Sequence, residues 1–287
     1  MDNNFVIDKL LFAFPRQFFY HKFSKEYAEK QIEYLPHKPD FEARYTVKRI
    51  AERPPGSPIG GKISFGFRSV PGGHPYLVSI RKIIGRGRNR RVPLRASDIV
   101  IRVGEYDLTV RDGPERDYNV REIITPNTFD RSTYETDISL LYIEGRGIQL
   151  RRGIIDLAEL PSENIRVSPN DRCFVSGWGD TEQGPSNVVR EAQLKYFNPG
   201  EQARCQNLYR SQREVTRSMF CAGTDDGVPR DTCLGDSGGP FICQINGRRM
   251  LIGITSWGVR ECGRPFYPGV YTDVRVLRQW IRNNAGI

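Results

Sequence analysis

The stretch Gly235-Asp236-Ser237-Gly238-Gly239-Pro240 decides the fold class of this chain, and Asp231 stands six residues before its serine. A serine hydroxyl becomes a strong nucleophile only when a base removes its proton. Glycines around it allow a tight turn, in which backbone N–H groups can stabilise the oxyanion of an attacked carbonyl. On its own a Gly-x-Ser-x-Gly pattern is a weak signal of a nucleophilic serine, and no histidine stands near it in the sequence.

Length and cysteine usage set limits on the class of protein. The 287 residues suffice for one large all-β domain with an extension. No run of about 18 apolar residues occurs, so no membrane span is predicted. The six cysteines all lie from Cys173 to Cys262, which favours disulfides made in an oxidising compartment. Free thiols or a zinc site are the alternative, which the lack of any Cys-x-x-Cys pair disfavours.

The first residues give no clear export signal. A short apolar stretch, 10–14, follows Asp2 and Asp8 and is interrupted by Pro15-Arg16, so a signal peptide is poorly supported. A secreted location is therefore inferred from the cysteines alone.

The net charge of +9 is unevenly distributed. Residues 81–95 contain Arg81, Lys82, Arg95 and further arginines but no acidic residue. Such a field can attract a polyanion or an acidic partner, although a solvated loop is the simpler interpretation. No aromatic residue is interleaved for base stacking, so nucleic-acid binding is not expected.

The chain divides near residue 62. Residues 1–62 contain no cysteine, a charged and helix-compatible piece at 24–35, and a linker at 54–58, so they are expected to be a pro-region. Residues 63–287 contain short β-rich runs separated by Gly and Pro turns, which favour a sandwich or barrel. The runs are 75–80, 99–103, 137–143, 173–178 and 250–256, and Val276, Leu277, Trp280 and Ile281 recur at the spacing of a closing helix.

Several segments from residue 63 onward resemble, in order, the chymotrypsin/trypsin family of serine proteases. They are Pro75-Tyr-Leu-Val-Ser-Ile, Thr136-Asp137-Ile-Ser-Leu-Leu, Ser176-Gly-Trp-Gly179, Phe220-Cys-Ala-Gly223, the serine stretch, and Ser256-Trp-Gly258 with Pro268-Gly-Val-Tyr271. The resemblance implies two antiparallel Greek-key β-barrels and a C-terminal helix. It implies no required cofactor.

By this resemblance Ser237 is the nucleophile and Asp137 orients the catalytic imidazole, with Ser256 donating a hydrogen bond to its carboxylate. The N–H groups of Gly235 and Ser237 form the oxyanion hole. Asp231 lies at the floor of a pocket for Arg or Lys side chains, so the family cleaves protein and peptide substrates after these residues. Thr232, Ser256, Trp257, Gly258 and Gly269 form the pocket with it, and Glu261 lies near its rim.

The resemblance also pairs the cysteines, which spacing alone leaves open. It joins Cys173 to Cys243, Cys205 to Cys221 and Cys233 to Cys262. The last bridge ties the serine loop to the pocket wall.

One block of the family pattern is missing. Members carry a Cys-Gly-Gly-Ser strand and an Ala-Ala-His-Cys turn before the catalytic aspartate, whereas here Ile80 is followed by the basic run and Ala96. The first barrel is therefore expected to be truncated, with unpaired edges. His21, His37 and His74 are the three histidines of the chain, and none takes the catalytic place.

Two further sites follow from the resemblance. The loop 104–115 resembles a calcium loop, with Glu105, Asp112 and Glu115 giving carboxylates and Asp107 and Val110 giving backbone carbonyls. The alternative is a solvated acidic turn, because Arg111 and Arg116 are close in sequence. Activation is expected by cleavage between Lys62 and Ile63, so that the new ammonium group pairs with Asp236, although Ile59 is a rival start and Phe65 replaces the usual glycine.

Three functions remain open on the sequence. The chain is a serine endopeptidase by family that is inactive as written, a protease homologue that binds basic peptides or polyanions, or a splice or gene-model product of an active protease.

Overall fold

The computed structural model describes most of the chain from residue 63 onward. The described residues are 63, 66–82, 95–111, 113–181, 184–228, 230–233, 235–259, 262–264 and 267–286, together with the backbone of 10–13. The predicted helical piece at 24–35, the linker at 54–58, Lys62, Asp112 and Glu261 lie outside them.

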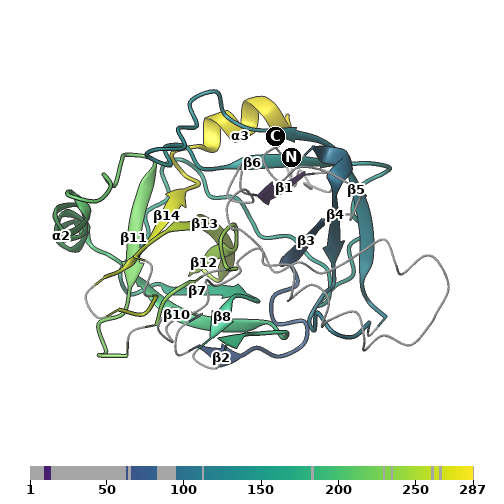
Figure 1. The fold of residues 1–287 in the computed structure, drawn as a ribbon, viewed down its shortest axis with the longest axis horizontal. Helices are drawn as coiled ribbons and strands as arrows, with labels where there is room; N and C mark the ends of the chain where they lie inside the picture. The colour runs from purple at the N-terminus through teal and green to yellow at the C-terminus, as the bar shows by residue number, and fades with distance from the viewer. Residues whose placement is uncertain are drawn as a thin grey trace, which may run out of the picture.

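The first part of the fold is an antiparallel sheet of five strands with the order β1-β6-β5-β4-β3 (Figure 1). Its inner face is apolar, because Ile101, Val120, Leu141 and Ile143 pack in one cluster. The strands are β1 (Leu10–Ala13), β3 (Val78–Lys82), β4 (Ile99–Val103), β5 (Arg116–Ile124) and β6 (Ser139–Ile143), and the short 3-10 helix η3 (Ala96–Asp98) precedes β4.

The second part is a closed barrel. Its sheet has the order β11-β14-β13-β12-β7-β10-β2, and β10 also pairs with β11, which joins six of these strands in a ring. The aromatic rings of Phe220, Phe241 and Tyr271 pack against one another in its centre. The strands are β2 (Phe67–Arg68), β7 (Arg172–Gly177), β10 (Arg190–Tyr196), β11 (Met219–Gly223), β12 (Pro240–Ile245), β13 (Arg248–Trp257) and β14 (Gly269–Asp273), and β8 (Asp180–Thr181) forms a hairpin with β9 (Gly184–Pro185).

Helix α3 (Arg278–Ala285) confirms the predicted closing helix. Leu277 and Ile281 are buried in a cluster with Ile138 of the chain before β6 and Ile254 of β13. The helix therefore packs on residues from both parts of the fold. The expectation for Val276 was wrong, because its side chain is 54% exposed.

Helix α2 (Pro199–Tyr209) was not predicted. Its start has a local signal, since the Asn198 side chain accepts from the Glu201 N–H while the Glu201 carboxylate accepts from the Asn198 N–H. This reciprocal cap, with Pro199 at the first helical position, marks a helix N-terminus.

The truncation of the first barrel differs from expectation at one edge. The strand before the basic run, β3, pairs directly with β4. The outer edge of β6, however, is not open, because β1 pairs along it. This strand comes from the segment that the sequence analysis assigned to a pro-region.

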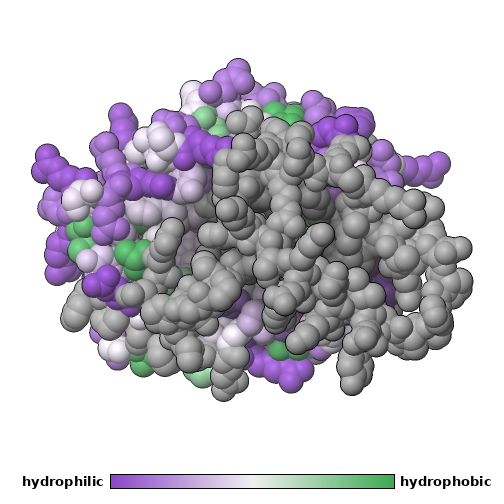
Figure 2. Space-filling view, viewed as in Figure 1, coloured by the Kyte–Doolittle hydropathy of each residue, from purple (hydrophilic) through white to green (hydrophobic). Residues whose placement is uncertain are grey.

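The described residues visible on one face of the molecule are mostly hydrophilic (Figure 2). On the face drawn in Figure 2, hydrophobic residues appear as small separate areas between hydrophilic ones. No helix among the described residues is long and apolar enough to cross a membrane.

Candidate active site

Ser237 lies in a turn that hydrogen bonds hold to strand β13. The N–H of Gly238 donates to the carbonyl of Thr255 at 3.0 Å, and the N–H of Thr255 donates to the carbonyl of Gly239 at 2.9 Å. Gly235 has a φ of +95°, and an added Cβ would lie 3.1 Å from the Cα of Gly179. A side chain at residue 235 would therefore be strained in backbone conformation and crowded against the facing loop.

Asp137 is bound by Ser256, the residue that follows Thr255 in β13. The Ser256 hydroxyl donates to Asp137 Oδ2 at 2.8 Å, as the resemblance predicts. Because Thr255 binds the serine turn and Ser256 binds Asp137, β13 holds both groups from adjacent positions. Asp137 is 1% exposed, and burial raises its pKa to about 7, against the opposing effects of Ser256 and Arg213.

Arg213 is a site residue that sequence reasoning missed. Its guanidinium lies 3.8 Å from the ring centre of Tyr134 and 5.4 Å from that of Trp257. Tyr134 and Thr136, just before Asp137, have positive φ angles of 62° and 51°. Such backbone conformations cost free energy for residues other than glycine. The stacked arginine lies beside this segment, and its positive charge favours the ionised form of Asp137.

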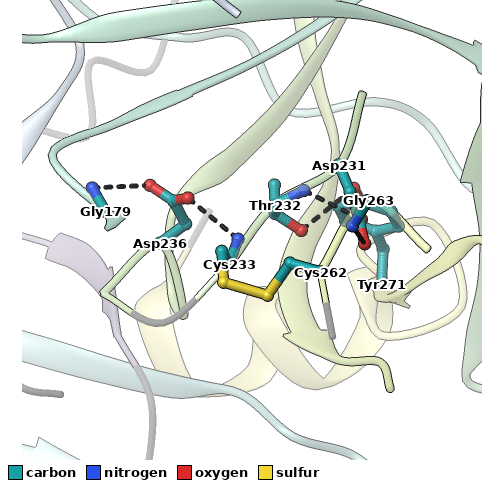
Figure 3. Close-up of a disulfide and its surroundings, with 8 residues drawn as sticks. All are labelled: Gly179, Asp231, Thr232, Cys233, Asp236, Cys262, Gly263 and Tyr271. Atoms are coloured by element: carbon teal, nitrogen blue, oxygen red, sulfur yellow. Dashed lines mark hydrogen bonds between the residues drawn. A yellow bond between two sulfur atoms is a disulfide. The ribbon is translucent and has the colours of Figure 1, made fainter. Parts of the chain in front are cut away.

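Asp231 is a buried carboxylate held by backbone donors (Figure 3). The N–H of Thr232 donates to Oδ1 at 2.8 Å, and the N–H of Gly263 donates to Oδ2 at 3.2 Å. No basic side chain among the described residues forms an ion pair with it. Burial raises its pKa to about 7. The carboxylate is therefore buried with its charge uncompensated by the part of the chain described.

Gly269 lies against this carboxylate, and Gly258 lies close to Gly269. An added Cβ at Gly269 would lie 2.8 Å from Asp231 Oδ1 and 2.9 Å from the Tyr271 hydroxyl, so no larger residue fits there. The position where a Cβ of Gly258 would stand is 3.9 Å from the Cα of Gly269. Gly258, which follows β13, thus lies close to Gly269 of β14. The Tyr271 hydroxyl lies 3.2 Å from Thr232 Oγ1.

Asp236 is a third buried carboxylate of the site, and in Figure 3 it lies on the opposite side of the Cys233–Cys262 disulfide from Asp231. Its oxygens accept from the N–H groups of Gly179 and Cys233, each at 2.9 Å. It is 2% exposed, and burial raises its pKa to about 7. Ile63 is also fully buried, in the core of the second barrel.

The three disulfides join the cysteines that the resemblance pairs. Cys173–Cys243 links β7 to β12, Cys205–Cys221 links α2 to β11, and Cys233–Cys262 links the serine loop to the segment that binds Asp231. Bridges over 70, 16 and 29 positions of the chain restrict the unfolded state. They fit a protein made in an oxidising compartment.

His74 is engaged in other contacts. Its Nδ1 lies 2.8 Å from the Tyr76 hydroxyl, and its Nε2 lies 2.5 Å from Glu191 Oε2. Burial is the main effect on its pKa and lowers it, against the opposing effect of Glu191. A neutral ring that donates to Glu191 and accepts from Tyr76 uses both nitrogens, so neither is free for Ser237. His21 and His37 lie outside the described residues.

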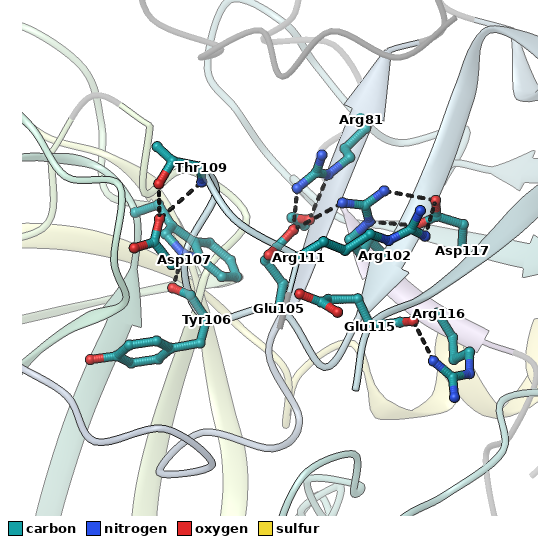
Figure 4. A network of polar contacts seen from close by, with 12 residues as sticks. Arg81, Arg102, Glu105, Tyr106, Asp107, Thr109, Arg111, Glu115, Arg116 and Asp117 are labelled. Carbon is teal, nitrogen blue, oxygen red and sulfur yellow. Dashed lines mark hydrogen bonds and ion pairs between the residues drawn. The ribbon is translucent and has the colours of Figure 1, made fainter. Parts of the chain in front are cut away.

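In the loop that resembles a calcium site, arginine side chains contact the carboxylate of Glu105 (Figure 4). Arg81 donates to the Glu105 carboxylate, and both side chains are buried. Arg102 lies 3.6 Å from the same Glu105 oxygen and binds Asp117 through two hydrogen bonds of 2.6 and 2.8 Å. The guanidinium groups thus supply positive charge where the resemblance predicted a metal ion.

Two of the other expected ligands, Glu115 and Asp107, have partners within their own loop. Glu115 accepts from the Gly113 N–H at 2.8 Å, and the Asp107 carboxylate accepts from the N–H and the hydroxyl of Thr109. The carbonyl of Asp107 accepts from the N–H of Val110. No group of three His, Cys, Asp or Glu side chains that could hold a metal ion occurs in the described part of the chain. The charge of Arg81 is not available to a partner of the basic run, because its guanidinium is paired with Glu105.

We expect Glu105→Gln to lower the free energy of unfolding by about 3 kcal/mol, because it leaves the buried Arg81 facing Arg102 without a counter-charge. Arg81→Met should cost less, because Glu105 keeps Arg102. Urea denaturation at neutral pH measures both. Arg111→Ala is the control, since its pair with Asp117 is exposed and worth under about 1 kcal/mol. Equal small decreases in the free energy of unfolding in all three variants would contradict a stabilising role of the ion pairs among Arg81, Glu105 and Arg102.

Comparison with known proteins agrees with this geometry. The family model Trypsin matches residues 89–281. Trypsin-1 of Astacus astacus is 36% identical over 66% of this chain and 76% of its own length. Serine protease 1 of Homo sapiens is 36% identical over 65% of this chain and 71% of its own length. Vitellin-degrading protease of Bombyx mori is 32% identical over 84% of this chain and 92% of its own length.

The matched residues cover the six strands of the closed ring, the serine turn, and Asp137, Asp231 and Asp236. The match with the family model begins at 89, inside the junction between Ile80 and Ala96. The serine turn, the disulfides and the double-barrel fold are therefore found together with the sequence similarity, and the chain belongs to the Trypsin family of serine proteases.

Proposed function

We propose that this chain has the binding site of a serine endopeptidase for Arg or Lys side chains, but binds basic peptides without efficient cleavage. The observation that carries the proposal is Asp231, a buried carboxylate with two backbone donors and no basic partner among the described residues. An ionised carboxylate in such surroundings gains more from a cation than an exposed one does. Gly269, which lies against it, carries no side chain that would fill the space a cationic side chain would use.

The proposed chemistry lacks one component. Ser237 would attack the carbonyl carbon of the peptide, and the N–H groups of Gly235 and Ser237 would stabilise the oxyanion. Asp137, with Ser256, would orient an imidazole and stabilise its charged form. The Ser237 hydroxyl forms no hydrogen bond with any residue of the described part, and His74 is committed to Tyr76 and Glu191. Without a base the hydroxyl keeps its proton, so attack is slow.

Activation by cleavage between Lys62 and Ile63 is part of the same proposal. Asp236 is buried with a raised pKa and two N–H donors, but it forms no ion pair within the described residues. The ammonium group of a newly exposed Ile63 would supply the missing positive charge and order the serine turn. Ile59 remains the rival start.

Benzamidine binding tests the pocket. Its amidinium matches a carboxylate through two parallel hydrogen bonds. Because the pKa of Asp231 is about 7, the free carboxyl is largely protonated at about pH 5 and ionised at about pH 8. Affinity should therefore rise as the pH increases through 7 and then level off. Binding below pH 7 should release a proton, which calorimetry in buffers of different ionisation enthalpy detects.

The pH dependence also identifies the residue. Asp236 and Asp137 have pKa values of about 7 as well, so Asp231→Asn is the control that should remove the pH dependence of any remaining binding. An affinity that is constant or falls from about pH 5 to about pH 8 would contradict the assignment of Asp231.

Two parts of the proposal concern location and other partners. A secreted protein fits the three disulfides and the trypsin relatives. A polyanion partner for the basic run stays a prediction, and Arg81 takes no part in it because it is paired with Glu105. Sequencing the transcript across the codons for Ile80 and Ala96 would distinguish a natural homologue from a splice or gene-model product.

A further inference from the structure

Strand β6 has neighbours on both of its long edges. On one edge it pairs with β5, and on the other with β1, where Leu10 faces Tyr142, Leu11 faces Leu141, Phe12 faces Leu140 and Ala13 faces Ser139 (Figure 1). Without β1, the backbone N–H and C=O groups on that edge would have no partner in the described sheet. Such an edge is open to pairing with other chains.

We propose that residues 10–13 are a lasting strand of the protease domain, which replaces the strand missing between Ile80 and Ala96. The extension 1–62 would then be more than a removable pro-region. It contains no cysteine, so if the chain is cut after Lys62, only non-covalent contacts can hold it. The pairing of β1 with β6 is the contact that would retain it.

The composition of β1 suits this position. Leu140, Leu141 and Ile143 of β6 are all buried, and they alternate between the two faces of the sheet. Leu141 belongs to the core of the first sheet, while the hydroxyl of Tyr142 donates to the carbonyl of Asn284 in α3. The sheet is therefore covered on both faces at β6. Strands in such sheets are apolar without alternation, and Leu10-Leu11-Phe12-Ala13 is a continuous apolar run.

The register also relates the extension to the active site. Ala13 is paired with Ser139, two residues after Asp137. The strand thus supports the part of β6 that follows the catalytic-type aspartate. Its loss should loosen β6 while β13, on the other side of Asp137, keeps its pairing with β12 and β14.

A cutting experiment on the full chain tests the proposal without relying on enzymatic activity or on the Asp231 pocket. The recognition sequence of a site-specific protease replaces residues 54–58, and the cut protein is passed over a size-exclusion column. We expect mass spectrometry to find the extension in the same peak as the remainder. In a variant with Gly-Ser-Gly-Ser at residues 10–13 the extension should elute separately. The same replacement at residues 32–35 is the matched control and should leave it bound.

Hydrogen exchange provides a second measurement on the uncut chain. Amides of residues 139–143 should exchange slowly in the unmodified protein and in the control. In the 10–13 variant, the β6 amides that face β1 should lose their protection while β4 keeps its own. If that variant does not fold, the measurements on the unmodified chain still test the proposal. Separation of its extension after cutting, or fast exchange on the β1 side of its β6, would overturn the proposal.

Discussion

Insertion of the missing family segment is expected to convert this chain into a working protease. A segment running from a Cys-Gly-Gly strand to an Ala-Ala-His-Cys turn, placed between Ile80 and Ala96, would supply the base and a fourth disulfide. Comparable serine proteases lose about a million-fold in turnover without the base. We therefore expect a gain of at least about ten-thousand-fold in hydrolysis of Arg-terminated amides after cleavage at Lys62, measured as chromogenic amide turnover.

The design must allow for strand β1. A closed first barrel needs the inserted strand to lie between β3 and β6, because these are the ends of the remaining four-strand order. The insert and β1 would then compete for the edge of β6. The insertion is therefore made both in the unmodified chain and in the chain with Gly-Ser-Gly-Ser at residues 10–13, and the second should be the more active.

Two controls separate catalysis from contamination. Alanine in place of the inserted histidine, and Ser237→Ala in the inserted chain, should each return turnover to the starting level. If the inserted protein is folded and cut after Lys62 but shows no activity, the missing base does not explain the inactivity. Phe65, which stands where the family has glycine, would then be the next residue to replace.

Asp231→Asn is expected to weaken benzamidine binding by at least about 100-fold. The substitution keeps the shape of the side chain and removes its charge, and removing one partner of a buried charged pair costs about 2–5 kcal/mol. Calorimetry at about pH 8, where Asp231 is ionised, measures the largest difference. Asp226→Asn is the matched control, because it makes the same change of charge at an exposed carboxylate paired with Arg230.

Asp231→Asn should weaken benzamidine binding but make the folded protein less sensitive to rising pH. A carboxyl whose pKa is raised on folding makes the native state less stable as the pH rises from its unfolded pKa, near 3.8, to its folded pKa, about 7. Asparagine cannot ionise, so the free energy of unfolding of Asp231→Asn should fall less than that of the parent between about pH 4 and about pH 7.

For the binding experiment, equal benzamidine affinity in Asp231→Asn and Asp226→Asn would refute the pocket assignment.

The sequence predicted the parts of the site that short motifs encode. The serine turn and the contact of Ser256 with Asp137 follow from motifs found in order along the chain, whereas the role of Asp231 stays a prediction. The disulfides follow from the same alignment, and the closing helix from the spacing of Leu277 and Ile281. The start of α2 also had a local signal, the reciprocal cap of Asn198 and Glu201, which the sequence analysis overlooked.

Other features needed the tertiary structure. Arg81 and Glu105 are 24 positions apart, and nothing in either segment distinguishes a metal-binding loop from one neutralised by a buried guanidinium. The sequence equally could not show that Leu10–Ala13 would pair with Ser139–Ile143, more than 100 positions away. Local propensity depends on neighbouring residues, whereas the free energies of a buried ion pair and of a strand edge depend on which distant groups replace the water around them.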